Sequence, residues 1–236
     1  MCNLYSMTRN REAILRLFRI AANRAAVFAP LEAIFPGHQA PVIRQAPDGE
    51  RELVQMSWGF VLPQKGKAPR RVTNVRDDTL RTNTFWRGSF EERRCLVPAT
   101  SFCEPNGDVK PATWHWFALK GERAGTDQAG PAPAQPQPRP VFAFPGIWRR
   151  YSGPLRKDGE PVDIDVYAFL TTTPNRLVAT INHERMPVLL TTQGACETWL
   201  AGTPQEALAL VREHPPEAMQ IVREGFDKAD PAEISP

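Results

Sequence analysis

The sequence predicts a mainly β or α+β domain. Short runs of β-branched and aromatic residues, bounded by Pro and Gly, are far more frequent than helical periodicities. Strand and helix patterns do not alternate as they do in a parallel α/β fold, and no segment is repeated. With 236 residues, of which 42% are hydrophobic, the chain is long enough to fold as one domain around a substantial core.

The first part of the chain contains one helical pattern and one strand pattern. Residues Arg11 to Asn23 predict an amphipathic helix, because their apolar side chains recur at helical spacing. A loop is expected next, since prolines interrupt the segment 30–41. Residues Leu53 to Leu62 then predict a strand that ends at Pro63.

Strand patterns dominate the middle of the chain. The apolar run Cys95 to Phe102 is typical of a buried strand and stops before the turn sequence that begins at Pro105. Three further segments rich in β-favouring residues predict strands: Thr113 to Leu119, Val141 to Trp148 and Val162 to Thr172. The segment Gly121 to Pro140 is rich in Pro, Ala and Gln, with almost no large apolar side chain, so we expect a disordered insertion there.

The C-terminal part is expected to be helical. A short helical turn is predicted over Gly194 to Leu200. Thr203 and Glu206 have the spacing of a capping box, and Pro204 occupies the first helical position, so a helix is predicted from there to about Glu213.

Composition indicates where in the cell the protein is expected and which bound metals or cofactors are not expected. No apolar run approaches the roughly 20 residues that a membrane-spanning helix needs, and polar residues interrupt the first ten positions, where a signal peptide would be apolar. We therefore expect a soluble, cytoplasmic protein. The cysteines form neither a Cys-x-x-C pair nor a Cys/His ligand pattern, so no structural metal, cofactor or disulfide framework is expected; they are Cys2, Cys95, Cys103 and Cys196.

Basic residues are concentrated in one segment. Between Lys65 and Arg94 there are nine basic and four acidic residues, although the net charge of the chain is only +3. This excess is compatible with a nucleic-acid partner, because Arg and Lys bind phosphate. A solvated Arg-rich surface is the alternative explanation.

The second residue, Cys2, has distinctive chemistry if the initiator Met1 is removed. A mature N-terminal cysteine carries an α-amine and a thiol on one skeleton, and the pKa of an α-amine is only about 8. The amine can condense with an aldehyde to an imine, and the thiol can then close a thiazolidine ring. Alternatively, the thiol can attack an acyl carbon while the amine acts as base.

Five short strings stand out in order along the chain. They are Met1-Cys2, Trp58-Gly59 with Pro63, Asn74 with Arg76 and Thr79, Arg94-Cys95-Leu96 with Pro98-Ala99 and Phe102-Cys103-Glu104, and His183 with Arg185-Met186-Pro187. In this order they resemble the SRAP (SOS-response-associated peptidase) family, whose members shield abasic sites in single-stranded DNA, and the resemblance spans residues 2 to about 200. It implies an α+β fold with a mainly antiparallel, barrel-like β core flanked by a few helices, in a single domain of residues 2–236.

The resemblance implies a catalytic set of Cys2, Asn74, Glu104 and His183. Cys2 would capture the ring-opened aldehyde of an abasic deoxyribose as a thiazolidine. Glu104 and His183 would transfer protons during ring opening and crosslink formation or reversal. The Asn74 amide would accept from the Cys2 amine and donate to a sugar oxygen.

The same resemblance, together with the basic segment, suggests five DNA-binding residues. Arg76 would hold a flanking phosphate as a bidentate donor, and Arg81 is a second phosphate candidate. Trp58 would stack on an unpaired base, with a place in the core as the alternative. Pro36 and Thr172 occupy expected contact positions, and an ordinary strand threonine is the alternative for Thr172.

Three functions remain open at this stage. The leading prediction is a monomeric, cytoplasmic protein, associated with the nucleoid when bound to DNA, that crosslinks to abasic sites in single-stranded DNA. A cysteine peptidase that removes its own Met1 is the alternative, although the basic segment has no obvious use there. A non-covalent reader of modified bases would leave Cys2 without a role.

Overall fold

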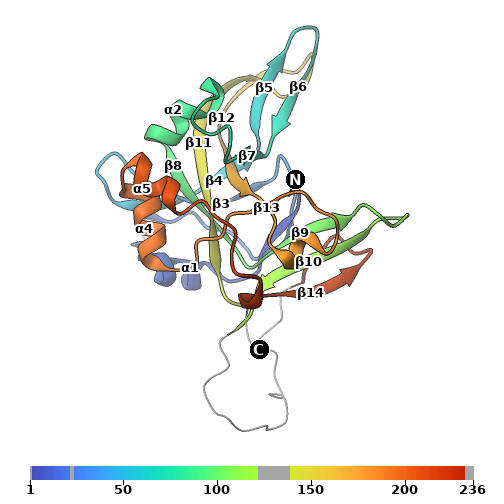
Figure 1. Ribbon diagram of the computed structural model, residues 1–236. Coiled ribbons are helices and arrows are strands. Elements are labelled where there is room, and N and C mark those ends of the chain that lie inside the picture. Colours follow the sequence, from blue (N-terminus) through green and yellow to red (C-terminus); the bar gives the residue numbers. More distant parts are fainter. Residues whose placement is uncertain (1, 22–23, 122–138, 232–236) are drawn as a thin grey trace.

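A closed barrel of five strands forms the centre of the computed structural model, which describes residues 2–21, 24–121 and 139–231 (Figure 1). The strands are hydrogen-bonded in the order β11, β8, β3, β4 and β12, and the pairing of β12 with β11 closes the ring. Neighbouring strands are antiparallel except β4 and β12, which run parallel. The barrel strands are β3 Gln39–Gln45, β4 Arg51–Trp58, β8 Arg94–Ala99, β11 Phe142–Pro154 and β12 Pro161–Thr172.

Two short strands lie beside the end of β12. Strand β7, Asn74–Arg76, pairs in parallel with β12, and Asn74 lies opposite Phe169. Strand β13, Met186–Pro187, pairs antiparallel with the last two residues of β12. Asn74 and the segment before Met186 are therefore held at the same end of the barrel.

A second, antiparallel sheet packs against the barrel. Its order is β14, β10, β9, β1 and β2, and the chain passes from barrel to sheet at Thr100, the single residue between β8 and β9. Tyr5 and Phe102 of this sheet place their rings 5.6 and 6.4 Å from the ring of Phe144 in the barrel. The strands are β1 Tyr5–Met7, β2 Leu31–Ile34, β9 Ser101–Asn106, β10 Thr113–Leu119 and β14 Met219–Gly225.

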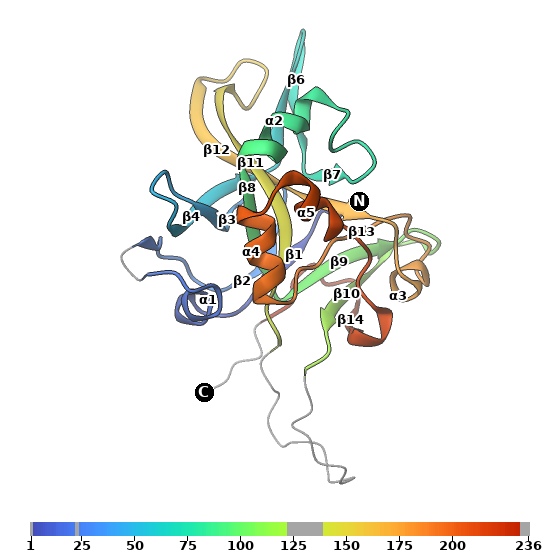
Figure 2. The same cartoon turned by 60° about the vertical axis from the view of Figure 1, so that its left-hand side comes forward.

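Short helices cover parts of the barrel. Figure 2 shows α4 and α5 in front of the barrel strands. The Trp199 indole on α4 donates to the carbonyl oxygens of Cys95 and Gly146, which fixes that helix to β8 and β11. The helices are α1 Arg11–Phe18, α2 Thr84–Glu92, α3 Arg176–Ala179, α4 Gln193–Ala201 and α5 Pro204–Ala209, with a 3₁₀ turn at Pro216–Ala218.

A hairpin projects beyond the barrel. Its strands, β5 Phe60–Gln64 and β6 Lys67–Val72, form a two-stranded sheet of their own. Gly59 separates β4 from β5 and has a φ of +105°, a conformation that L side chains rarely adopt. The chain leaves the barrel at this glycine. Figures 1 and 2 both show the hairpin projecting at the top of the view.

The predicted α+β class with an antiparallel, barrel-like core is confirmed. Strand β10 has the predicted bounds, and strands β11 and β12 contain most of the two later predicted strands. The capping box of Thr203 and Glu206 is present, but helix α5 ends at Ala209, before the expected Glu213. Of the predicted disordered insertion, residues 122–138 lie outside the described residues.

Three other predicted boundaries are wrong for local reasons. Helix α1 ends at Phe18, before Asn23, because Arg19 adopts a left-handed conformation with a φ of 55°. The strand expected to end at Pro63 is interrupted at Gly59, and Pro63 lies inside β5. The run Cys95 to Phe102 contains parts of two strands that belong to different sheets.

Strand β3 was missed because prolines predicted a loop. Pro41 lies inside β3 opposite Gln55 of β4. It is tolerated there because β8 pairs with β3 only at Ile43 and Arg44, so no second neighbour needs the missing N–H of Pro41. The periodicity also missed α2 and β14.

Candidate active site

The N-terminal segment and β7 bring Cys2 and Asn74 together. The Asn74 Nδ2 donates to the Cys2 carbonyl oxygen at 2.7 Å and to Thr73 Oγ1 at 2.8 Å. Thr73 Oγ1 in turn donates to Asn3 Oδ1 at 3.2 Å. Two acceptors on Nδ2 define the orientation of the Asn74 amide, so Asn74 Oδ1 is the atom that faces away from them.

Asn74 Oδ1 is an acceptor without a donor. The side chain is 5% exposed, and among the described residues nothing donates to Oδ1. Both amide hydrogens are already used, so Asn74 can accept a hydrogen bond from the Cys2 nitrogen or from a ligand. For Asn74 to donate to a sugar oxygen as predicted, that oxygen would have to replace one of these two acceptors.

Glu104 and His183 form a buried acid–base pair. Glu104 lies on β9 and is 0% exposed, and its Oε2 is 3.1 Å from Nε2 of His183, in the loop before β13. The other ring nitrogen, Nδ1, donates to the Arg185 carbonyl oxygen at 2.7 Å. Because Nδ1 carries this hydrogen, close approach of Nε2 to the carboxylate requires a second proton between them.

The second oxygen of Glu104, Oε1, is also a buried acceptor without a hydrogen-bond donor among the described residues. A buried acceptor that is left unpaired costs about 1–3 kcal/mol. Most buried polar atoms in folded proteins are paired, so unpaired ones mark places where a ligand or water completes the bonding.

Burial and the charge of Glu104 together shift the pKa values of His183 and Cys2. Burial alone lowers the pKa of His183, but the Glu104 carboxylate more than offsets this and raises the pKa above its ordinary value. Burial, reinforced by the charge of Glu104, raises the pKa of the Cys2 thiol well above its usual range. The thiol is therefore neutral at pH 7, and its hydrogen is directed at the Leu4 carbonyl oxygen, 3.4 Å away.

Arg185 and Asp77, which the sequence analysis did not assign, hold the His183 loop. Arg185 Nη2 donates to Asp77 Oδ1 and to the Thr171 carbonyl oxygen, both at 2.5 Å. Thr172 Oγ1 donates to Asp77 Oδ2 at 2.6 Å. Burial raises the pKa of Asp77, but the bonds from Thr172 and Arg185 outweigh it and the pKa is lowered. Asp77 lies within the string from Asn74 to Thr79, and Arg185 within the string that begins at His183, so their places in these motifs could have indicated their roles.

Burial corrects two of the expected DNA contacts. Trp58 is 0% exposed, stacks on Phe169 with ring centroids 5.2 Å apart, and donates from its indole to the Thr73 carbonyl oxygen at 3.1 Å. It is a core residue and has no free face for a base. Thr172 is 4% exposed and its hydroxyl is used by Asp77, so its side chain has a structural role.

The other three candidates lie at the surface. Pro36 and Gly37 form a turn in which the His38 N–H donates to the Phe35 carbonyl oxygen, with a φ of +91° at Gly37. Arg76 is exposed and pairs with Asp78 at 2.5 Å, so a phosphate would have to replace that carboxylate. Arg81 is exposed.

All four cysteines are buried free thiols. Within residues 2–21, 24–121 and 139–231, no three side chains of the metal-binding types cluster as a metal site would require. None of the helices in this part of the chain is long and apolar enough to cross a membrane.

Comparisons with known proteins match nearly the whole chain. Residues 1–224 match the family model described as SOS response associated peptidase (SRAP). The abasic site processing protein YoqW of Bacillus subtilis is 27% identical over 207 residues, covering 85% of this chain and 80% of that protein. The abasic site processing protein HMCES of Gallus gallus is 28% identical over 182 residues, covering 72% of this chain and 52% of that protein.

Solved structures share the fold. A protein of Bordetella bronchiseptica aligns with a TM-score of 0.67 at 21% identity, covering 95% of this chain and 98% of that chain. A protein of Bacteroides thetaiotaomicron aligns with a TM-score of 0.68 at 21% identity, covering 94% and 92%.

Proposed function

This chain belongs to the SRAP family, and from that premise we propose that it captures abasic sites in single-stranded DNA as a covalent crosslink through Cys2. The names of the relatives YoqW and HMCES, both abasic site processing proteins, support an abasic site as the substrate. The observation that carries the proposal is the pair of buried, unpaired acceptors, Asn74 Oδ1 and Glu104 Oε1.

The reaction begins with an amine. While Met1 is attached, the Cys2 nitrogen is an amide nitrogen and cannot form an imine, so Met1 must be removed first. The free amine then adds to the aldehyde carbon of the ring-opened sugar, and loss of one water gives an imine. The Cys2 sulfur adds to the same carbon, its proton passes to the nitrogen, and a thiazolidine is closed with one water released overall.

In these reaction steps, the buried pair of Glu104 and His183 would supply a proton. Loss of water from the first adduct needs a proton on the departing hydroxyl. We assign this proton to the pair of His183 Nε2 and Glu104 Oε2, which are 3.1 Å apart. The charge of Glu104 also acts on Cys2, because it raises the pKa of the Cys2 thiol. Asn74 Oδ1 would accept a hydrogen from the amine and orient its lone pair toward the aldehyde. This chemistry uses no cofactor.

The peptidase alternative is less well supported. A cysteine peptidase attacks with a thiolate, whereas burial and Glu104 both raise the pKa of Cys2. An amine-first mechanism does not need the thiolate.

The test uses a uracil-containing single-stranded oligonucleotide treated with uracil glycosylase, followed by a denaturing gel. Wild-type protein should give a shifted band and Cys2→Ala none, while Cys2→Ser should be poor because an oxazolidine is less stable. Cys196→Ser, which alters another buried thiol, should crosslink like the wild type. Mass spectrometry should find Met1 absent from the crosslinked protein. Crosslinking by protein that retains Met1 would overturn the mechanism.

A further inference from the structure

The β5–β6 hairpin concentrates positive charge on an arm that the catalytic set does not use. Between Phe60 and Val72 there are four basic residues and no acidic residue. Lys65 and Lys67 lie at the tip and Arg70 along β6, all three exposed, while Arg71 is partly buried. An exposed two-stranded hairpin is marginal by itself in water, so its position must be maintained by contacts at the root.

Arg71 fastens the root of the hairpin on one side. Its Nη1 donates to the carbonyl oxygens of Trp58 and Gly59, each at 3.2 Å. Its guanidinium also lies beneath the Pro36 turn, since a Cβ built on Gly37 would be 3.3 Å from Arg71 Nε. This charge is therefore engaged with backbone groups and acts within the fold.

Arg149 of β11 fastens the other side. Its guanidinium lies over the rings of Phe60 and Phe85, 4.8 and 4.4 Å from their centroids, and Nη2 donates to the Val61 carbonyl oxygen at 3.0 Å. With Arg71 and Arg149 at its root, the hairpin is a supported arm with a defined direction.

The exposed cations of the hairpin, Lys65, Lys67 and Arg70, differ from two exposed arginines elsewhere on the surface. Arg76 and Arg150 form ion pairs of 2.5 and 2.6 Å with carboxylates. In the described part of the chain, Lys65, Lys67 and Arg70 form no such pair. Across a cleft from the hairpin, the β11–β12 turn contributes Lys157 and Asp158 to the lining. This turn also contains Arg156 and Glu160, so it adds no net charge. Unneutralised cations on a projecting arm fit a polyanion, because binding releases its condensed counterions.

The arm begins beside the reactive residues. Strand β6 ends at Val72, two residues before Asn74, which bonds to the Cys2 carbonyl oxygen. At about 3.3 Å per residue, the five residues of β5 extend roughly 17 Å from this point. A strand whose abasic sugar reaches Cys2 can therefore run along the hairpin for several phosphates.

We propose that the β5–β6 hairpin is a phosphate-binding arm for the DNA strand that flanks the abasic nucleotide. Lys65, Lys67 and Arg70 contact the backbone without reading bases, and Arg71 and Arg149 hold the arm in place. This inference rests on the proposed function, because the flanking strand is defined by the abasic site.

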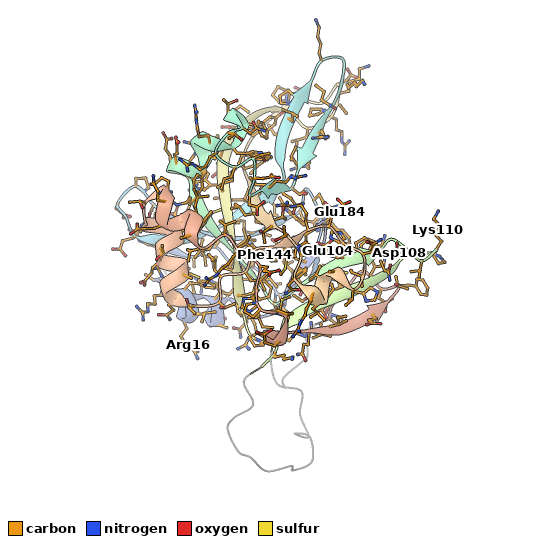
Figure 3. All side chains as sticks on the ribbon, viewed as in Figure 1. Arg16, Glu104, Asp108, Lys110, Phe144 and Glu184 are labelled. Carbon is orange, nitrogen blue, oxygen red and sulfur yellow. The ribbon has the colours of Figure 1, made fainter. Side chains whose placement is uncertain are left out.

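The test measures binding and crosslinking separately. The triple variant Lys65→Gln, Lys67→Gln, Arg70→Gln removes only exposed charges. On an undamaged single-stranded DNA oligonucleotide, the slope of log affinity against log salt should fall by about 2, since each single-strand phosphate contact contributes about 0.7. A charge-matched control changes Arg16, Lys110 and Lys120 to Gln, and its slope should stay within about 0.7 of the wild type. Figure 3 shows Arg16 and Lys110 well away from the hairpin.

Crosslinking to the abasic oligonucleotide should be slower for the triple variant below saturation and equal to the wild type at saturating DNA. Equal salt slopes for the triple variant and the control would refute the proposal that the hairpin binds DNA phosphates. A slope change with RNA of the same sequence but not with DNA would refute it too. The single variant Lys67→Gln provides an independent check, with an expected slope change of about 0.7. If wild-type protein fails to crosslink while the slope difference holds, the proposed function fails and the arm remains as a DNA-binding element.

Discussion

Replacing Asn74 should show how much its hydrogen bonds contribute to the stability of the fold, compared with those of its neighbour Asn3. The Asn74→Ala variant loses the two hydrogen bonds from Nδ2, at 2.7 and 2.8 Å. Thr73 Oγ1 keeps its bond to Asn3, but the Cys2 carbonyl oxygen loses the side-chain donor that now reaches it. Two bonds at about 1 kcal/mol each are lost and the carbonyl is left unpaired, but the variant also removes the buried, unpaired Asn74 Oδ1, so we expect a net destabilisation of about 1–2 kcal/mol.

The Asn74→Asp variant tests the direction of the amide. Aspartate keeps the shape of the side chain but replaces the donor with an oxygen that faces the Cys2 carbonyl oxygen. Burial would raise the pKa of this carboxyl in the folded state above its unfolded value. Its destabilisation should therefore be greatest near pH 7 and should lessen as the pH falls through the folded-state pKa, because the protonated acid can donate again.

Thermal unfolding between pH 5 and pH 8 measures both effects. For a chain of this size, about 1–2 kcal/mol corresponds to a melting temperature lowered by roughly 2–8 °C. Asn3→Ala is the matched control, since it removes only the exposed end of the same chain of bonds and should melt close to the wild type. An Asn74→Ala variant that melts like the wild type, or an Asn74→Asp variant indifferent to pH, would refute the assigned geometry.

Two further predictions concern charged groups. In the wild type, the raised pKa of His183 contributes stability below about pH 6.5, and this stability is lost as the pH rises through the folded-state pKa. In Glu104→Gln the carboxylate is absent and burial lowers the pKa of His183, so stability should instead increase as the pH rises in this range. Melting temperatures across pH 5–8 test the change of sign, and an unchanged slope would contradict it. Arg76→Ala should lower the salt slope of single-strand binding by about 0.7 for every sequence, whereas an unaltered slope would mean that Arg76 serves only its ion pair with Asp78.

Residues that act through local chemistry could be predicted from the sequence. The cysteine next to Met1, the motifs of Asn74, Glu104 and His183, and the capping box at Thr203 are recognisable because short patterns specify them. Four of the five barrel strands were recognisable too, since burial on both faces favours runs of apolar residues, whereas the prolines in and before β3 concealed it. The ends of helix α1 and of strands β4 and β8 were less predictable, because Arg19, Gly59 and Thr100 redirect the chain without a strong compositional signal.

By itself, the sequence determined the class of fold, the family motifs that contain the proposed reactive residues and the presence of a basic segment. Tertiary structure alone decided how each side chain is used. Trp58 is buried because Phe169 and Tyr5, distant in the chain, enclose its ring. Arg71 stabilises the hairpin root while Arg70, its neighbour, faces solvent. Burial and hydrogen-bond partners depend on which distant strands meet, and no local pattern of residues encodes that meeting.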